Sequence, residues 1–200
     1  MNDANGDYTA EITAEIRESI QVKQGVIETQ LAPINDIVNL IIKTLRTGNK
    51  VLFFGNGGSA ADSQHIAAEF VSKFNRVRSA LPAIALTTDT SILTSIGNDF
   101  GFDYVFARQI EALGQSGDVA VGFSTSGNSP NVLRALQTAR DKGMVAVGFT
   151  GQNGGALQNC VDICFNAPSS STARIQEAHI TAAHIICELV EKEFAGSSDA

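Results

Sequence analysis

The sequence predicts an α/β protein with a doubly wound, five-stranded parallel sheet and an N-terminal helical extension. The prediction depends on three observations: short apolar runs after Lys50, glycine-rich or serine-rich turns after several of them, and helical patterns between them. Strands that alternate with helices form parallel sheets covered on both faces. The runs expected to be strands are Val51–Phe54, Ala83–Leu86, Val119–Phe123, Met144–Phe149 and Val161–Phe165.

Helical spacing of apolar residues predicts the elements between and around these strands. Within the α/β part the expected helices are Ala60–Lys73, Ser91–Ile96, Tyr104–Ala112, Asn131–Lys142 and Ala173–Phe194. Two more precede Lys50: one carries Ile12, Ile16, Ile20, Ile27 and Leu31 until Pro33 interrupts it, and the other spans Ile34–Leu45. Because these two lie outside any βαβ unit, we expect residues 1–48 to pack on the core or on another subunit. Residues 49–196 would form the main domain of a single structural unit.

Composition excludes several classes of function. The formal net charge of −7 argues against a nucleic-acid partner, whose phosphates require a clustered positive surface. The N-terminus MNDANGDYTAE is acidic and polar, unlike a signal peptide, and no apolar stretch is long enough to cross a membrane. Three cysteines fit neither a disulfide framework nor a zinc ribbon. A cytoplasmic location is the expectation.

A glycine-rich turn, Gly55-Asn56-Gly57-Gly58-Ser59, joins the first expected strand to its helix. Open α/β sheets bind ligands outside the carboxyl ends of their strands, where helix N-termini present free N–H groups. The turn matches neither the GxGxxG fingerprint nor a P-loop. The competing interpretation is a plain tight turn in which Ser59 caps the helix.

A hydroxyl-rich loop, Ser124-Thr125-Ser126-Gly127-Asn128-Ser129, follows the strand Val119–Phe123. Its hydroxyls and the N-terminus of the next helix can hold a phosphate dianion without a basic side chain. The competing interpretation is a polar loop with one capping serine, but four hydroxyls among six residues exceed what capping needs. We therefore predict a phosphate site here.

The three histidines are His65, His179 and His184. His65 and Glu69 are four residues apart on the helix after the glycine turn, so their side chains share one face. Such a pair beside a phosphate loop suits a divalent metal or acid–base chemistry. The competing interpretation is a surface helix with an incidental polar face. Apolar neighbours at Ile66–Ala68 and Phe70 predict instead that this helix is largely buried.

Several strings together resemble the phosphoheptose isomerase family of sugar isomerase (SIS) domains, in order, from about residue 10 to 194. The strings are GNGGSAADSQHIAAEF, LPAIALTTDTS, IGNDFGF, STSGNSPNVLRAL and ARIQEAHITAAHIICELVEKEF. The resemblance implies a flavodoxin-like SIS fold and a cytoplasmic homotetramer with sites at subunit interfaces. It implies an enzyme that interconverts sedoheptulose 7-phosphate and D-glycero-D-manno-heptose 7-phosphate, the first step towards the nucleotide-activated heptoses of lipopolysaccharide or capsule.

By motif position, the resemblance also implies the site residues. One zinc ion per site would be held by His65, Glu69, Gln176 and His184. Substrate contacts would come from Asn56, Gly57, Gly58, Ser59, Glu69, Asn98, Asp99, Ser124, Thr125, Ser126, Ser129 and Gln176. Many relatives carry arginine where this chain has Lys73, so the bidentate fork of a guanidinium is lost there.

Isomerisation through an enediol needs a base at carbon and an acid at oxygen, which we assign to Glu69 and His184. Because a carboxylate bound tightly to zinc is a weaker base, Glu69 as base, as zinc ligand or as both in turn stay open alternatives. Two other functions remain open. A non-catalytic relative of this fold binds the bacterial replication initiator, but it lacks counterparts of both these residues. A sugar-phosphate-sensing regulatory domain is a third possibility, without the DNA-binding segment that would accompany it. Gln176 and His184 are eight positions apart on one expected helix and do not converge naturally. Either that helix begins after Gln176, or one of the two serves a neighbouring subunit.

Overall fold

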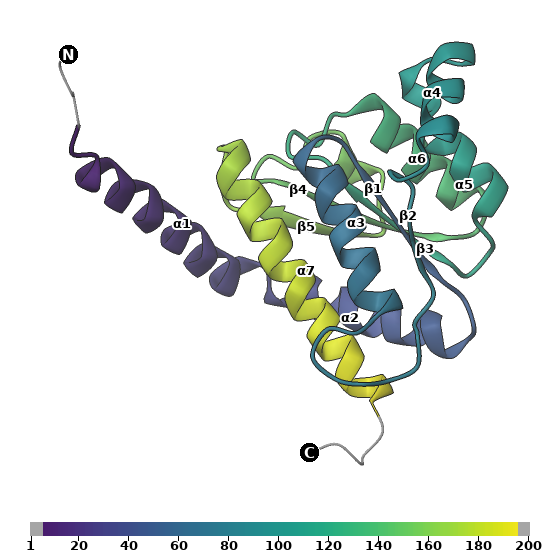
Figure 1. Cartoon of the computed structure of the whole chain (residues 1–200), viewed down its shortest axis with the longest axis horizontal. Coiled ribbons are helices and arrows are strands. Elements are labelled where there is room, and N and C mark those ends of the chain that lie inside the picture. Colours follow the sequence, from purple (N-terminus) through teal and green to yellow (C-terminus); the bar gives the residue numbers. More distant parts are fainter. Residues whose placement is uncertain (1–5, 196–200) are drawn as a thin grey trace.

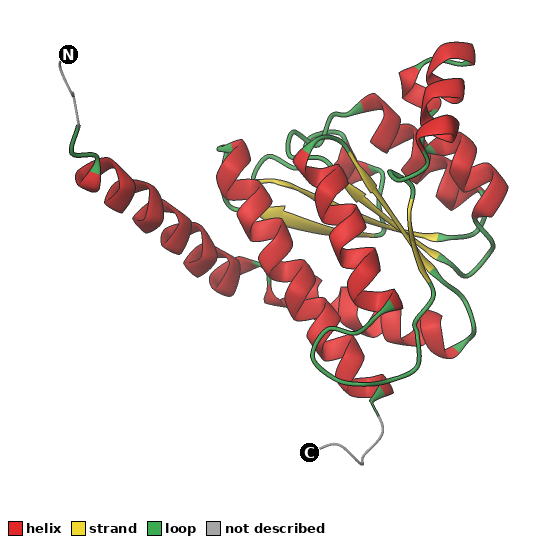
Figure 2. Ribbon diagram, in the orientation of Figure 1, coloured by secondary structure: helices red, strands yellow, loops and turns green. Residues whose placement is uncertain are grey.

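The computed structural model describes residues 6–195 and confirms the doubly wound α/β fold (Figures 1 and 2). Its sheet is entirely parallel with strand order β2-β1-β3-β4-β5. The strands are β1 (Val51–Gly55), β2 (Ala83–Ala85), β3 (Val119–Phe123), β4 (Val145–Gly151) and β5 (Ile163–Ala167). The helices are α1 (Thr9–Thr29), α2 (Leu31–Arg46), α3 (Gly58–Val71), α4 (Thr90–Asp99), α5 (Ala107–Leu113), α6 (Pro130–Asp141) and α7 (Thr172–Phe194). Two 3₁₀ turns, η1 (Phe102–Tyr104) and η2 (Leu157–Asn159), complete the described chain.

Successive residues of each strand face opposite sides of the sheet, and each side has its own core. Phe53 joins one core with apolar residues of α2, α3 and α7, whereas Phe54 joins the other with residues of α4, α5 and α6. Both phenylalanines are almost completely buried. Two covered faces explain why these strands are continuous apolar runs rather than alternating ones.

The two N-terminal helices differ in how they are used. The apolar face of α2 is buried against the sheet and α7, with Ile37 and Ile41 each only 1% exposed. By contrast, α1 projects from the body of the molecule (Figure 1), and its only buried side chains are Val22 and Val26. The chain breaks at Gln30, before Pro33, which lies in the first turn of α2. The expectation that Pro33 ends the first helix is therefore wrong. Proline fits the first turn of a helix, because the backbone N–H groups there have no carbonyl acceptor within the helix.

The expected element boundaries are otherwise close, with small shifts at the ends. The helix expected at Tyr104–Ala112 is a 3₁₀ turn followed by α5, and the strand expected at Val161–Phe165 begins at Ile163. Residues 1–5 and residue 196, the outer ends of the two expected segments, lie outside the described residues. Within residues 6–195 no helix is both long and apolar enough to cross a membrane.

His179 is completely buried where α7 crosses the sheet. Its Nε2–H donates to the carbonyl oxygen of Thr150 at 3.0 Å, and its ring packs on Phe123, Phe149 and Phe165. Its Nδ1 has no partner in the described chain. Burial lowers the pKa of His179 to about 4, although the bond to Thr150 opposes the shift. This histidine is a neutral part of the core, not a site residue.

The buried neutral His179 predicts a pH-dependent stability. Because its folded-state pKa is depressed from 6.5 to about 4, the unfolded chain binds the proton more tightly. The contribution of neutral His179 to the free energy of unfolding is complete above pH 6.5. It is lost as the pH falls from there through the folded-state pKa, and the loss reaches about 3 kcal/mol at pH 4. Urea unfolding at fixed pH values measures the slope. His179→Gln, which keeps a donor for Thr150, should remove most of it. An unchanged slope in that variant would contradict the assignment.

Candidate active site

The carboxyl ends of β1 and β3 mark the point where the chain switches from one side of the sheet to the other, the usual ligand position in this topology. The side-chain amides of Asn56 and Asn131 exchange two hydrogen bonds of 2.9 Å across this point. They tie the turn after β1 to the start of α6. The cap of α3 is Gly57, with a positive φ of 57°, and Ser59 is buried. The alternative in which Ser59 caps the helix is therefore wrong.

The loop from Ser124 to Ser129 is folded by its own hydroxyls rather than used for capping. Ser129 is the N-cap residue of α6, but its side chain makes no capping bond. Its hydroxyl instead lies 2.9 Å from that of Ser124. Ser126 Oγ accepts from the backbone N–H of Asn128. The backbone N–H groups of Thr125 and Ser126 have no acceptor in the described chain, so they remain free for an anion.

A cavity of about 250 Å³ opens beside this loop, over the ends of β4 and β5. It is lined by Thr125, Ser126, Gly151, Gln152, Asn153, Gly154, Ser169, Ser170 and Ile175. The loop after β4 approaches so closely that a Cβ at Gly127 would overlap the carbonyl oxygen of Gly154. The residues after β4 and β5 were not among those predicted from the sequence. The signals were the strings TGQNGG and APSSS, which place polar and glycine residues at two further strand ends.

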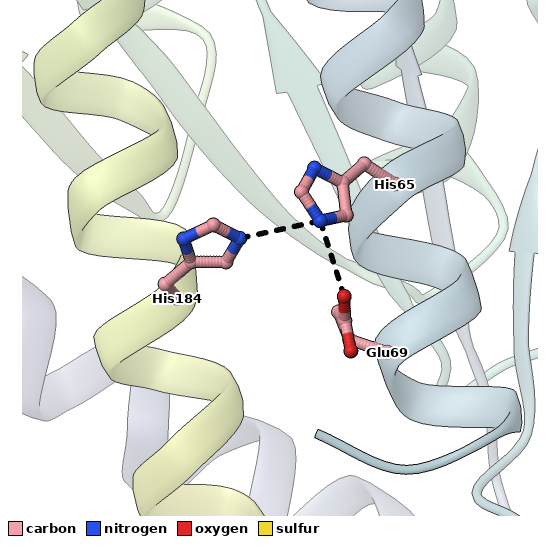
Figure 3. Close-up of side chains that lie close together, drawn as sticks. All are labelled: His65, Glu69 and His184. Carbon is pink, nitrogen blue, oxygen red and sulfur yellow. Dashed lines mark hydrogen bonds and ion pairs between the residues drawn. The ribbon is translucent and has the colours of Figure 1, made fainter. Parts of the chain in front are cut away.

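His65 and Glu69 of α3 and His184 of α7 point towards one another between the two helices (Figure 3). The Nε2 atom of His65 lies 3.1 Å from Oε1 of Glu69 and 3.4 Å from Nε2 of His184. Within residues 6–195 they form the one group of three histidine, cysteine or acidic side chains whose ligand atoms all lie within 4.8 Å of one another. The His65–Glu69 pair predicted from spacing is confirmed, and α7 brings the third donor.

The exposure of this cluster differs from the prediction. Ile66, Ala67 and Phe70 are buried, but His65 lies on the opposite, exposed face of α3, so the helix is half-buried rather than largely buried. The outer face of the helix therefore carries His65 and Glu69. Burial, followed by the neighbouring His65 charge, lowers the pKa of His184, while the Glu69 carboxylate opposes the shift.

The donor set fits a zinc ion. Two imidazoles and a carboxylate are common zinc ligands, and catalytic sites use three protein ligands with one open position. Two imidazole Nε2 atoms only 3.4 Å apart need a shared proton or a cation between them. A lowered pKa keeps His184 neutral, which is the form that binds metal.

Gln176 is not part of this cluster within the chain. Helix α7 is continuous from Thr172, so the alternative in which it begins after Gln176 is wrong. The Gln176 amide lies against Gly58, where an added Cβ would be 2.6 Å from its Nε2. Gly58 precedes His65 by seven residues, a rise of about 10 Å along α3. Gln176 therefore does not share a metal site with His65, Glu69 and His184 of its own chain.

Asn98 and Asp99 are also separate from the other predicted residues. They are exposed at the end of α4, where Asn98 Nδ2 donates to Asp99 Oδ1 at 2.7 Å. Figure 1 shows α4 on the side of the molecule away from α7. One chain therefore brings together His65, Glu69 and His184, and separately the strand-end loops, but not this pair.

Comparisons with known proteins identify the family of this chain. The model of the SIS domain family matches residues 16–151. A phosphoheptose isomerase of Roseiflexus sp. (strain RS-1) is 57% identical over 192 residues, covering 96% of this chain and 98% of the relative. That of Aquifex aeolicus (strain VF5) is 56% identical over 176 residues, covering 88% and 92%.

Solved structures give the same result. The phosphoheptose isomerase from Neisseria gonorrhoeae superposes with a TM-score of 0.88 at 43% identity, covering 93% of this chain and all of that one. The enzyme from Francisella tularensis gives 0.90 at 36% identity, covering 94% and 100%. The matched fold and sequences define a SIS-domain sugar-phosphate isomerase. Within that class, the chain belongs to the phosphoheptose isomerase family.

The close approach at Gly127 predicts how a substitution there would affect stability and phosphate binding by the hydroxyl-rich loop. Gly48 and Gly127 both have positive φ, but a Cβ at Gly48 would meet nothing within 4 Å. Gly48→Ala should therefore lower the free energy of unfolding by only about 1–2 kcal/mol, the cost of the left-handed conformation.

Gly127→Ala adds the displacement of the loop after β4. It should lower the free energy of unfolding clearly more than Gly48→Ala does. It should also weaken the binding of inorganic phosphate, measured by calorimetry. Equal losses of stability with unchanged phosphate binding would show that the two loops do not depend on this approach.

Proposed function

We propose that this chain interconverts sedoheptulose 7-phosphate and D-glycero-D-manno-heptose 7-phosphate with one zinc ion per site. The observation that supports it most is the convergence of His65, Glu69 and His184 in a chain that belongs to this family. The reaction is the first step towards nucleotide-activated heptoses in the cytoplasm, a location consistent with three unpaired cysteines. The same cluster argues against the non-catalytic, initiator-binding function, since that relative lacks two of its members.

The chain's own residues divide the reaction between two regions. The N–H groups of Thr125 and Ser126, the loop hydroxyls and the N-terminus of α6 bind the phosphate dianion. Glu69 removes the proton from the carbon beside the carbonyl and returns it to the neighbouring carbon, so no net proton is consumed. His184, neutral at pH 7, passes a proton between the two substrate oxygens. A bound zinc ion would polarise those oxygens.

The site is completed in a homotetramer. The face of α1 that the sequence marked as apolar is exposed, with Ile12, Ile16, Ile20 and Ile27 each more than half accessible. An apolar ridge of this length is buried by association. Because Gln176, Asn98 and Asp99 lie apart from the metal ligands, we assign them to the site of a neighbouring copy.

Glu69→Gln and His184→Ala should each lower turnover by about a hundredfold or more, as loss of an acid–base group does. The assay incubates purified protein with sedoheptulose 7-phosphate, with and without zinc, and follows the aldose product. Glu188→Gln is the matched control, because Glu188 is a half-exposed carboxylate of α7 paired only with Lys192. Wild-type turnover in a folded Glu69→Gln or His184→Ala protein would refute the catalytic assignment.

Subunit exchange tests whether Gln176 serves a neighbouring site. Mixing inactive Glu69→Gln and Gln176→Ala proteins should restore activity. In a mixed pair of chains, one of the two sites would combine the intact Glu69 of one chain with the intact Gln176 of the other. Mixing Glu69→Gln with His184→Ala should not, since these two side chains meet within one chain. No recovery in the first mixture, with mixed oligomers verified by mass spectrometry, would place Gln176 in the site of its own chain.

A further inference from the structure

A buried ion pair lies just beyond the metal cluster. The side chains of Arg78, in the segment after α3, and Glu191, near the end of α7, are only 2% and 1% exposed. Nε of Arg78 lies 3.5 Å from Oε1 of Glu191, an ionic contact rather than a hydrogen bond. Figure 1 shows the segment after α3 curving round the last turns of α7. Buried ion pairs often stabilise a fold no better than apolar residues of the same size, so stability alone is a weak reason for this one.

The Glu191 carboxylate holds the segment that follows α3. It accepts hydrogen bonds from three successive backbone N–H groups: Phe74 at 2.7 Å, Asn75 at 2.6 Å and Arg76 at 2.8 Å. Burial raises the pKa of Glu191, but these donors and Arg78 together outweigh it, so the pKa lies below its ordinary value. The carboxylate is therefore charged and fully engaged.

The Arg78 guanidinium holds the carboxyl end of α3. Its Nη1 donates to the carbonyl oxygens of Phe70 and Ser72, at 2.7 and 3.1 Å. Its Nη2 donates to the carbonyl oxygen of Glu69 at 2.8 Å. The last carbonyls of a helix lack partners within the helix, and a planar guanidinium suits several of them at once. One of these carbonyls belongs to the residue whose side chain is in the metal cluster.

The same network reaches His184 through Phe74. The ring of Phe74 lies 5.4 Å from the His184 imidazole, tilted by 33°. Its backbone N–H is one of the three held by Glu191. The Glu191 carboxylate thus holds Phe74 against His184, and its partner Arg78 holds the backbone of Glu69.

We propose that the Arg78–Glu191 pair is the positioning device that fixes Glu69 and His184 relative to each other. The inference rests on the proposed function, because it concerns the same three-residue centre. Neither residue contacts the reacting atoms. Their effect is on the geometry of the ligands, which for partners of this kind changes metal affinity about 10- to 100-fold.

The test compares Co²⁺ binding in two variants of buried ion pairs. Glu191→Gln removes the charge at the positioning pair. Asp118→Asn is the matched control: Asp118 is 1% exposed and bonds Lys50 Nζ at 2.6 Å, at the start of β1 and β3. Co²⁺ affinity is measured by chelator competition, His184 ring resonances by NMR, and melting temperature in parallel.

We expect Glu191→Gln to weaken Co²⁺ binding about 10- to 100-fold and to shift the His184 resonances. It should lower kcat with little change in KM for the sugar phosphate. Asp118→Asn should lower the melting temperature and leave the other readouts unchanged. Equal Co²⁺ affinities in the two variants would overturn the inference.

Two further results keep the inference separate from the proposed function. If wild-type protein fails to bind Co²⁺, the metal centre is wrong, and the His184 resonances and kcat of Glu191→Gln then decide the positioning role. Because a charge change in a buried pair can prevent folding, Phe74→Leu provides a second variant that removes the aromatic contact with His184. Unchanged Co²⁺ affinity and kcat in folded Phe74→Leu would contradict the route through Phe74.

Discussion

The register between α3 and α7 is the constraint on which the site depends. Both helices follow strands of one parallel sheet and cover the same face, so they run in the same direction side by side. Gly58 lies against Gln176, and two turns later His65 lies against His184. The missing side chain at Gly58 admits the Gln176 amide at this close contact. A shift of α7 by one residue would rotate His184 by about 100° and turn it away from His65 and Glu69.

Much of this arrangement could be predicted from local patterns, because the patterns have local causes. Apolar runs buried on both faces identified the strands, and the four-residue spacing of His65 and Glu69 identified a shared helical face. Pro33 was misread because one residue type both ends helices and begins them. The exposure of His65 was misread because buried neighbours specify one face of a helix and leave the other undetermined. His184 joined the pair through family resemblance, since no local pattern shows which helices are neighbours in space.

Two histidines five positions apart on α7 have different environments because they lie on different faces of the helix. His179 points to the sheet, has no contact with water and is a neutral hydrogen-bond donor to the carbonyl oxygen of Thr150. His184 points towards α3, is partly exposed, and its Nε2 lies 3.4 Å from Nε2 of His65. The residue type alone could not separate them. The three phenylalanines around His179, each on a different strand, are the tertiary information that the sequence pattern does not contain.

The outward position of the metal cluster has a consequence for regulation by mass action. The exposed His65 and the partly exposed Glu69 and His184 have protein on one side and water on the other. Water weakens the electrostatic interactions that stabilise an enediolate. In the proposed assembly a second copy supplies the missing wall. The catalytic environment is then a property of the oligomer rather than of the folded chain, so activity per subunit should depend on how much of the protein is present.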